Sequence, residues 1–297
     1  MTSLLAFLTL MFLIACTPSP EITDASSSSA AINEEAPYIW VNKTFPKTIQ
    51  ISPSFSVSEK LAISEMGSAW DTAVTNQKNF FKNDVTDNNN NFNITKTDTI
   101  FGVYKATTWP SDVSDMALAI TQLFGRRYNV GESNEYVGII EGDIIVNYSD
   151  PAIGDPFTFD SLEDGTDEDD GFDLRTVILH EMGHFLGLQH IPDYNHQPAG
   201  DPATSSTTYK ASSVMYPSIN QSDDKRVPKT KDINALVNKY NIGGGAAPAM
   251  VAAAALFQPK NNDPGKNVKI VIELRKSGEC IHKEDGAVIR RHHVKLK

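Results

Sequence analysis

Cysteine is scarce in this chain, whose 297 residues include only Cys16 and Cys280. Two cysteines cannot form the framework of a disulfide-stapled domain, so the fold must depend on a packed core. Histidine is missing from the whole stretch before His180, which excludes a histidine-containing metal site from that part of the chain. Positive charge is also in deficit, because 37 Asp and Glu outnumber 26 Lys and Arg, for a formal net charge of -11. We expect no nucleic-acid partner.

The apolar run from Leu4 to Ala15 is too short to span a bilayer permanently, and small residues follow it. Leu13-Ile14-Ala15-Cys16 resembles a bacterial lipobox, in which the cysteine is acylated and begins the mature protein. No Lys or Arg precedes the run, so a simple secretory signal is the alternative. We predict a signal peptide over residues 1–15 and membrane attachment through a lipid on Cys16. Thr17 is not the aspartate that retains lipoproteins at the inner membrane, which favours the outer membrane or cell surface.

Composition divides the remainder into four parts. Residues 16–37 are rich in serine and predict a flexible tether. Residues 38–243 are enough for one domain with a sizeable core, and we expect that domain to be a monomer. Residues 244–266 contain runs of glycine and alanine and predict a linker, and residues 267–297 form a basic tail or a small β appendage.

The stretch from His180 to His190 carries three histidines, a glutamate and a glycine at spacings that suit one metal ion. On an α-helix, residues four apart share a face, so His180 and His184 can bind the same metal. Gly187 can end the helix in the left-handed conformation, and His190 then turns back as the third ligand. Three protein ligands leave the fourth tetrahedral position to water, which is typical of a catalytic zinc. We therefore predict one bound Zn²⁺.

Glu181 lies about 100° around the same helix from its neighbours, close to that water but not aimed as a ligand. It is the candidate general base, and afterwards the acid that protonates a leaving amine. The residues around the histidines are apolar, which indicates a buried helix and argues against solvated histidines. These residues are Val177, Ile178, Leu179, Phe185, Leu186 and Leu188.

The pattern HExxHxxGxxH over residues 180–190 resembles the signature of the metzincin metalloproteases. Ser213-Val-Met-Tyr-Pro217 resembles the Met-turn of the same proteins, in which a methionine, here Met215, lies beneath the zinc site. Residues 173–180 and the helix-like stretch 231–240 are most similar to the matrixins. The resemblance implies an α/β (α+β) catalytic domain with a twisted mixed sheet, a buried zinc helix and a C-terminal helix.

The same resemblance implies polypeptide substrates. The predicted strand 142–148 would stand at the sheet edge above the cleft, where an extended peptide can pair with its backbone. Residues 217–229 would form the cleft wall that sets substrate preference. We therefore expect a zinc endopeptidase. The alternatives are a surface protein that binds zinc without turnover, which retention of Glu181 disfavours, and a zinc hydrolase of a cell-wall polymer.

Local patterns predict the elements that surround the zinc helix. Residues 48–55 alternate like a strand, and a helix follows from Ser58. A second strand is expected over residues 94–104. Residues 117–121 resemble a further short strand, with a helix as the alternative, and a surface loop is expected over residues 125–135.

Residues 155–173 contain nine acidic side chains and no Lys or Arg. Such a density of carboxylates suits Ca²⁺, and matrixins bind calcium in loops near this position. The alternative is a solvated acidic loop in front of a helix N-terminus, where negative charge is favourable. The calcium candidates are Asp164, Asp167, Asp169, Asp170 and Asp173.

The C-terminal segment from residue 259 onward is basic, with ten basic and five acidic residues. Residues 268–274 alternate like a strand with which residues 287–296 can pair. The segment could dock on the acidic domain or on anionic polymers, or remain a solvated tail, with His292 and His293 facing solvent. Cys280 could in principle reach back as an inhibitory thiolate, but its neighbours show nothing that lowers the pKa of the thiol, so this is not expected.

Overall fold

A twisted mixed sheet of nine strands organises the fold of this computed structural model. The expected mixed α/β architecture is confirmed. Contacts divide the chain into two units, residues 1–34 and 35–297, and every described element belongs to the second. The structure describes residues 36–41, 45–74, 79–84, 97–149, 157–161, 171–190, 213–217, 219–221, 223–240, 242, 257–260, 263–276 and 279–293.

One half of the sheet is mainly parallel. Strands β3, β2, β4 and β6 are neighbours in that order, each parallel to the next, and β1 runs parallel to another part of β6. The bounds are β1 Tyr38–Trp40, β2 Lys47–Ile51, β3 Phe81–Asp84, β4 Phe101–Ala106 and β6 Tyr136–Asn147.

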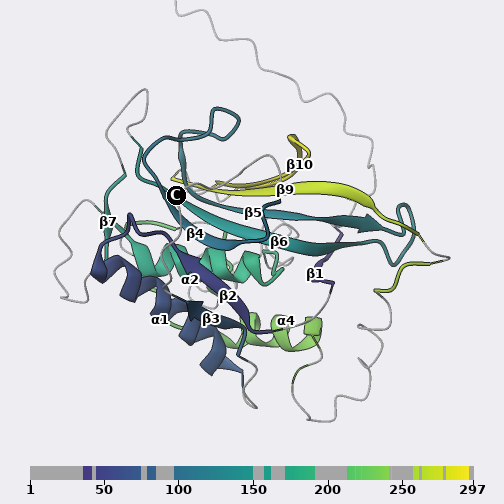
Figure 1. Ribbon diagram of the computed structural model, residues 1–297, viewed down its shortest axis with the longest axis horizontal. Helices are drawn as coiled ribbons and strands as arrows, with labels where there is room; N and C mark the ends of the chain where they lie inside the picture. Colours follow the sequence, from purple (N-terminus) through teal and green to yellow (C-terminus); the bar gives the residue numbers. More distant parts are fainter. Residues whose placement is uncertain are drawn as a thin grey trace, which may run out of the picture. The chain divides into compact units, whose positions relative to one another are not determined.

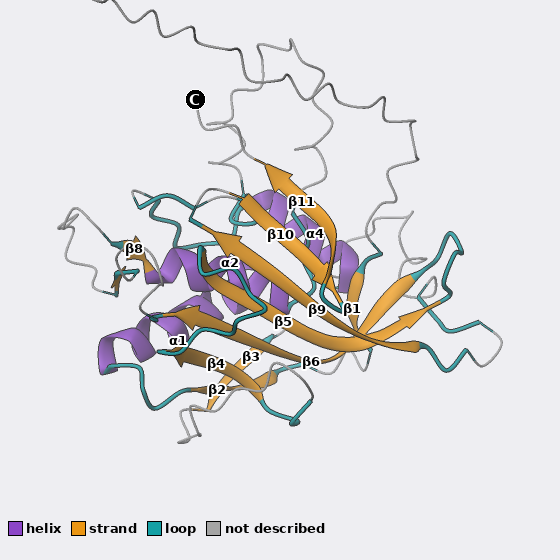
Figure 2. Ribbon diagram, turned by 90° about the horizontal axis from the view of Figure 1, so that it is seen from above, coloured by secondary structure: helices purple, strands orange, loops and turns teal. Residues whose placement is uncertain are grey.

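The other half is antiparallel. Strand β5 (Ala117–Tyr128) pairs with β6 on one side and with β9 (Lys266–Arg275) on the other. Strand β10 (Glu279–Glu284) follows β9, and β11 (Ala287–His293) forms the outer edge. Figure 2 shows these strands side by side, so segments far apart in sequence form one continuous surface.

The three helices within the described residues lie on one side of the sheet (Figure 1). Helix α1 (Val57–Ala73) begins at Ser56, whose side chain accepts from the Glu59 amide while the Glu59 carboxylate accepts from the Ser56 amide. This capping box satisfies two amides that the first helical turn leaves without partners. Helices α2 (Leu174–Phe185) and α4 (Thr230–Tyr240) complete the layer. None of the helices in the described ranges is both long and apolar enough for a membrane crossing.

The main core lies between the helices and the sheet, where α1, α2 and α4 all contribute buried side chains. The opposite face of the sheet is covered locally by a smaller cluster that includes Val113 and, partly buried, Trp109. Because both faces are covered, β5 is buried almost continuously instead of alternating, as expected for a central strand. A short parallel pair, β7 (Phe159–Asp160) and β8 (Phe172–Asp173), precedes α2.

The expected edge strand is not at an edge. Residues 142–148 were expected there, but β6 has β5 on one side and β4 and β1 on the other. The strand expected over residues 117–121 continues to Tyr128, so the loop expected over residues 125–135 is shorter and occupies residues 129–135 between β5 and β6. Long-range partners extend β5 beyond its local pattern, and they also give β6 neighbours on both sides.

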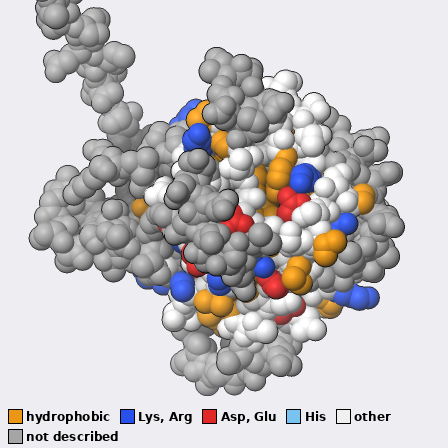
Figure 3. Space-filling view, turned by 90° about the vertical axis from the view of Figure 1, so that its left-hand side faces the viewer, with side chains coloured by type: hydrophobic (Ala, Val, Ile, Leu, Met, Phe, Trp, Pro, Cys, Tyr) orange, Lys and Arg blue, Asp and Glu red, His pale blue; other side chains and the backbone are white. Residues whose placement is uncertain are grey.

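The C-terminal segment is not a separate appendage or a solvated tail. Its strands β9 to β11 continue the main sheet and belong to the same unit as α2. Residues 287–293 pair with β10, not with β9 as expected. The side chains of His292 and His293 lie outside the described part of the structure. Figure 3 shows acidic, basic and apolar side chains mixed over the described part of one face, without a surface of single charge.

Candidate metal centre

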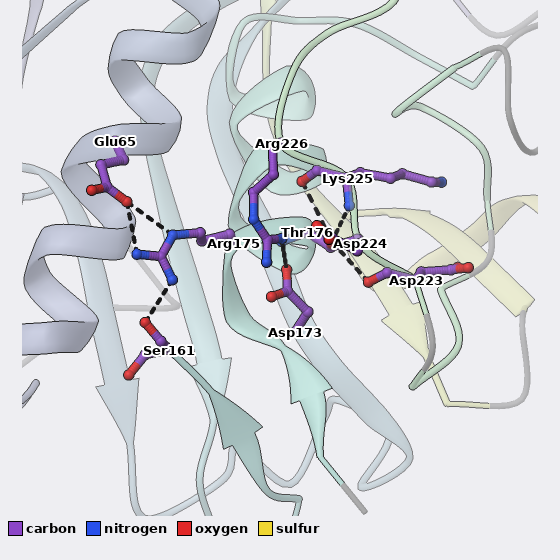
Figure 4. Close-up of polar contacts among 9 residues, drawn as sticks. All are labelled: Glu65, Ser161, Asp173, Arg175, Thr176, Asp223, Asp224, Lys225 and Arg226. Carbon is purple, nitrogen blue, oxygen red and sulfur yellow. Dashed lines mark hydrogen bonds and ion pairs between the residues drawn. The ribbon is translucent and has the colours of Figure 1, made fainter. Parts of the chain in front are cut away.

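The N-terminus of α2 is fixed by a set of polar contacts (Figure 4). Asp173 accepts a hydrogen bond from the Thr176 amide at 2.5 Å, which makes it the N-cap, and Arg226 pairs with the same carboxylate at 2.6 Å. Arg175 joins the helix to α1 through Glu65 and also donates to the Ser161 carbonyl. These contacts hold the helix that carries His180 and His184 in a defined position against α1.

His180 and His184 lie one helical turn apart and are fully buried. The Nδ1 of His180 lies 2.8 Å from the Val214 carbonyl, and the Nδ1 of His184 lies 2.8 Å from the Leu188 carbonyl. A carbonyl oxygen only accepts, so both Nδ1 atoms carry the proton and both Nε2 atoms present a lone pair. Burial lowers the pKa of His180 to about 3, while the hydrogen bond to Val214 acts in the opposite direction.

Gly187 turns the chain after α2, as expected from its position. Its φ is +82°, and a Cβ added there would lie 2.4 Å from the Tyr38 carbonyl oxygen, so glycine is required for both reasons. The Leu188 amide donates to the Gly183 carbonyl, which closes the helix end. The turn brings His190 back, with its Nε2 3.4 Å from that of His180.

The three imidazoles fit a shared metal ion. The Nε2 atoms of His180 and His184 lie 3.0 Å apart although both present lone pairs, an arrangement that repels unless a cation lies between them. Tetrahedral Zn–N bonds of about 2.0–2.1 Å would place two such nitrogens roughly 3.3 Å apart. The observed separations of 3.0 and 3.4 Å lie on either side of this value.

Glu181 is fully buried beside the histidines and is held from the sheet. Thr121 of β5 donates its hydroxyl to Oε2 of Glu181 at 2.5 Å. The other oxygen, Oε1, has no hydrogen-bond partner among the residues that the structure describes. Burial raises the pKa of Glu181 to about 8, against the opposing effect of the Thr121 hydrogen bond. One carboxylate oxygen is thus anchored, and the other is left to receive a proton.

Met215 packs against α2, as the resemblance implies. A Cβ on Gly183 would lie 2.2 Å from the Met215 sulfur, so the thioether occupies the space that this glycine leaves. The turn itself is held by Asp232 of α4, whose carboxylate accepts from the Ser213 hydroxyl at 2.5 Å and the Val214 amide at 2.9 Å. Asp232 therefore positions the carbonyl that orients His180.

Cys280 is a fourth member of the cluster. Its sulfur and one nitrogen from each of the three histidines all lie within 4.8 Å of one another, and all four residues are buried. His282, two residues along β10, packs its ring against those of His184 and His190 at 5.7 and 5.1 Å between centroids. The residues around Cys280 gave no reason to expect an inhibitory thiolate, yet its sulfur lies among the histidine nitrogens. The available signal was the Cys-x-His spacing in an alternating strand, which places both side chains on one face.

The calcium candidates are only partly described. Asp164, Asp167, Asp169 and Asp170 lie outside the described residues, and Asp173 is engaged as the helix cap. Calcium binding therefore stays a prediction. The expected cleft wall over residues 217–229 is described except at residues 218 and 222. The Lys225 amide in this segment donates a hydrogen bond to the Thr176 hydroxyl at 2.8 Å, which joins the expected cleft wall to the first turn of α2.

Comparison with known proteins agrees with the motif. The family model described as "Matrixin" matches residues 140–196, which include β6 from Ile140 onward, helix α2 and the three histidines. "Matrix metalloproteinase-C" of Caenorhabditis elegans is 29% identical to this chain over 155 residues, which cover 49% of this chain and 24% of that protein. The chain thus matches about a quarter of the length of this curated relative. The sequence match, the mixed α/β fold and the histidine cluster together make the chain similar to a matrixin-like metzincin.

Proposed function

We propose that this protein is a zinc-dependent endopeptidase that hydrolyses extended polypeptides. His180, His184 and His190 hold the metal, and Glu181 exchanges the proton. When bound, zinc would supply a Lewis acid and an acidified water. The observation that carries the proposal is the environment of Glu181, in which Thr121 fixes Oε2 while Oε1 has no hydrogen-bond partner in the described part of the chain.

The roles of the chain's own residues follow from these contacts. The Val214 and Leu188 carbonyls hold the His180 and His184 rings in the tautomer that presents Nε2 to the metal. Burial raises the pKa of the Glu181 carboxyl to about 8, which favours the protonated form that can pass a proton to a leaving amine. Thr121 limits the rotation of the carboxylate, so the proton is accepted at Oε1 and can be passed from there to a leaving amine.

The Glu181→Ala variant tests the assignment. It is expected to bind one zinc per chain as the wild type does, because Glu181 is not in the ligand cluster, and to lose nearly all peptidase activity. Zinc content by atomic absorption and cleavage of a peptide library, with and without a chelator, are the measurements. Substantial cleavage by zinc-loaded Glu181→Ala would contradict the role of Glu181.

A second candidate is a zinc protein without turnover, which the presence of Cys280 beside the histidines favours. Four protein ligands would leave no position for water. A peptide library that stays intact under every condition supports this candidate. Parallel assays on casein, gelatin and purified cell wall separate the peptidase from a hydrolase of cell-wall polymer.

We also propose that the protein is exported and attached to a bacterial outer membrane or cell surface through a lipid on Cys16. The support is the lipobox-like sequence before Cys16. Mass spectrometry of the mature N-terminus tests the proposal, and Cys16→Ser is expected to release the protein from the membrane fraction.

A further inference from the structure

The strand β10 reaches the metal cluster from a segment far from α2 in sequence. Cys280 and the three histidines form a group of four buried donors within 4.8 Å. Cys280 is fully buried and forms no disulfide bond with any residue that the structure describes. The thiol of Cys280 is therefore next to the histidines in the folded chain and is not exposed to bulk water.

Sheet register explains how Cys280 arrives there. Thr121 of β5, which donates to Glu181, is paired with Ile272 of β9, and Ile272 is paired with His282 of β10. The next row on the same face contains Leu274 and Cys280. Two strands thus extend the sheet from the residue that holds Glu181 to a position over the metal ligands.

The donor set is that of a closed zinc site. Thiolate and imidazole are the ligands that zinc prefers, and three histidines with one cysteine complete a tetrahedron. A catalytic site must keep one position for water. With Cys280 in that position, Glu181 has no metal-bound water from which to accept a proton.

The same segment covers the strand edge that a peptide would use. Extended substrates bind by pairing with an unpaired strand edge near the reacting groups. Strand β5 is the strand that contacts Glu181, and β9 pairs with its outer side from Ala117 to Arg127. A peptide therefore cannot pair with the edge of β5, which β9 occupies, and cannot reach the fourth metal position, next to which Cys280 lies.

We propose that strands β9 to β11 keep the enzyme latent, with Cys280 as the fourth zinc ligand and β9 on the edge of β5 that a substrate would occupy. This inference rests on the proposed peptidase function. Coordination releases the thiol proton to solvent, and activation exchanges the metal–sulfur bond for a metal–water bond as the thiol is protonated again. Activation also requires β9 to leave β5.

Cobalt substitution tests the ligand. The full chain with Cys16→Ser, loaded with one Co²⁺, is expected to show a thiolate-to-cobalt charge-transfer band in the near ultraviolet. Adding Cys280→Ser is expected to remove the band while one Co²⁺ remains bound. The matched control is Ile281→Val, on the opposite face of the same strand, which should keep the band. Stoichiometric cobalt without the band in the Cys16→Ser chain would overturn the proposal.

Thiol reactivity gives a measurement that does not need the Cys280 variant to fold. In the Cys16→Ser chain, Cys280 is the only cysteine. Its reaction with a disulfide reagent is expected to be slow with zinc bound and faster after chelation, because coordination withdraws the thiolate. The rate is compared with the unfolding rate of each form, measured by fluorescence. A reaction equally slow in both forms, with unfolding slower than reaction, would count against coordination.

Activity tests latency. A specific-protease site inserted after Gly245 allows the segment before β9 to be cut. Cutting combined with Cys280→Ser is expected to raise kcat/KM at least about tenfold over the uncut wild type, since an open state populated at ~10% or less becomes the main one. The cut Ile281→Val chain keeps Cys280 and should gain less.

The outcomes separate this inference from the proposed function. If the uncut wild type, the cut Cys280→Ser chain and the cut Ile281→Val chain all cleaved peptides equally well, latency would be overturned and the proposed peptidase function would be supported. A cobalt–thiolate band would establish Cys280 as a metal ligand. If no variant then cleaved peptides, including the cut Cys280→Ser chain, both latency and the peptidase function would be overturned.

Discussion

Burial and hydrogen bonds from neighbouring residues set the protonation of individual carboxylates in this protein. Glu181 is fully buried, and one Thr121 hydroxyl distinguishes its two oxygens. The motif predicts the glutamate, but Thr121 is 60 positions away in sequence and has no motif of its own. Only the pairing of β5 with the rest of the sheet brings this hydroxyl to the metal helix.

Asp143 of β6 is a second buried carboxylate, away from the metal. Its Oδ1 accepts from the Gly102 amide at 2.9 Å. Burial raises its pKa to about 8, the Gly102 hydrogen bond opposes this, and the nearby Asp98 and Glu141 add to the rise. An acid whose folded pKa is raised binds more protons folded than unfolded, so its contribution to stability is lost as pH rises from about 4 to about 8.

Asp143→Asn is therefore expected to be more stable than the wild type at neutral pH. The amide keeps an acceptor for Gly102 and removes the charge. Its advantage should grow from near zero at pH 4 towards pH 8, by no more than ~1.4 kcal/mol for each pH unit. Urea unfolding of the two proteins across this pH range is the measurement. The exposed site Asp115→Asn is the control, and a difference independent of pH would refute the argument.

At the scale of elements, helix α2 depends on close contact with its neighbours. Trp70 of α1 donates its indole N–H to the Leu179 carbonyl at 3.0 Å, and Met215 fills the space above Gly183. The helix is buried along its whole length, so its partners determine its position. Local sequence predicts that α2 is a helix, whereas its partners in the fold determine where its histidines point.

Gly183→Ala tests this packing. The added Cβ would lie 2.2 Å from the Met215 sulfur and 3.0 Å from Trp70 Cζ2, so one of them must move. The better helix propensity of alanine returns about 1 kcal/mol, and we expect a net loss of about 1–3 kcal/mol in the free energy of unfolding. The Met-turn carries the carbonyl that orients His180, so zinc affinity should fall as well.

Urea unfolding and a competitive zinc titration measure the two effects of Gly183→Ala. The control is Gly171→Ala, where the nearest atom to a new Cβ is 3.5 Å away, an ordinary contact. If Gly183→Ala matched this control in both measurements, the packing argument would fail.

At the scale of the whole molecule, the C-terminal extension is part of the core. Ile272 of β9 is fully buried in the main cluster that includes α1, α2 and α4. Ile289 of β11, at the outer edge of the sheet, is 42% exposed. The extension therefore contributes to stability through β9 much more than through β11.

Ile272→Ala is expected to lower the free energy of unfolding by about 2–5 kcal/mol, because it leaves a cavity in the core. Ile289→Ala, the matched change in the same extension, should cost about 0.5 kcal/mol or less. Thermal and urea unfolding of the zinc-free proteins measure both. Similar costs for the two variants would show that β9 is not part of the folded core in solution.

Local sequence by itself determined the zinc helix, the turn at Gly187, the first helix near Ser58 and the closing helix near residue 231. These features depend on residues a few positions apart, through helix spacing, capping and the φ freedom of glycine. The motif also predicted which three imidazoles meet, because two share a helical face and the third follows a fixed turn.

Only the tertiary structure decided which strands are neighbours. Strand pairing joins residues more than a hundred positions apart, and alternation within one strand does not identify its partner. The resemblance implied an edge position for β6, and alternation alone left the C-terminal segment outside the domain, whereas β5 and β9 pair along their length. The same pairing brings Thr121 to Glu181 and Cys280 to the histidines, so the composition of the metal centre depends on the sheet as much as on the helix.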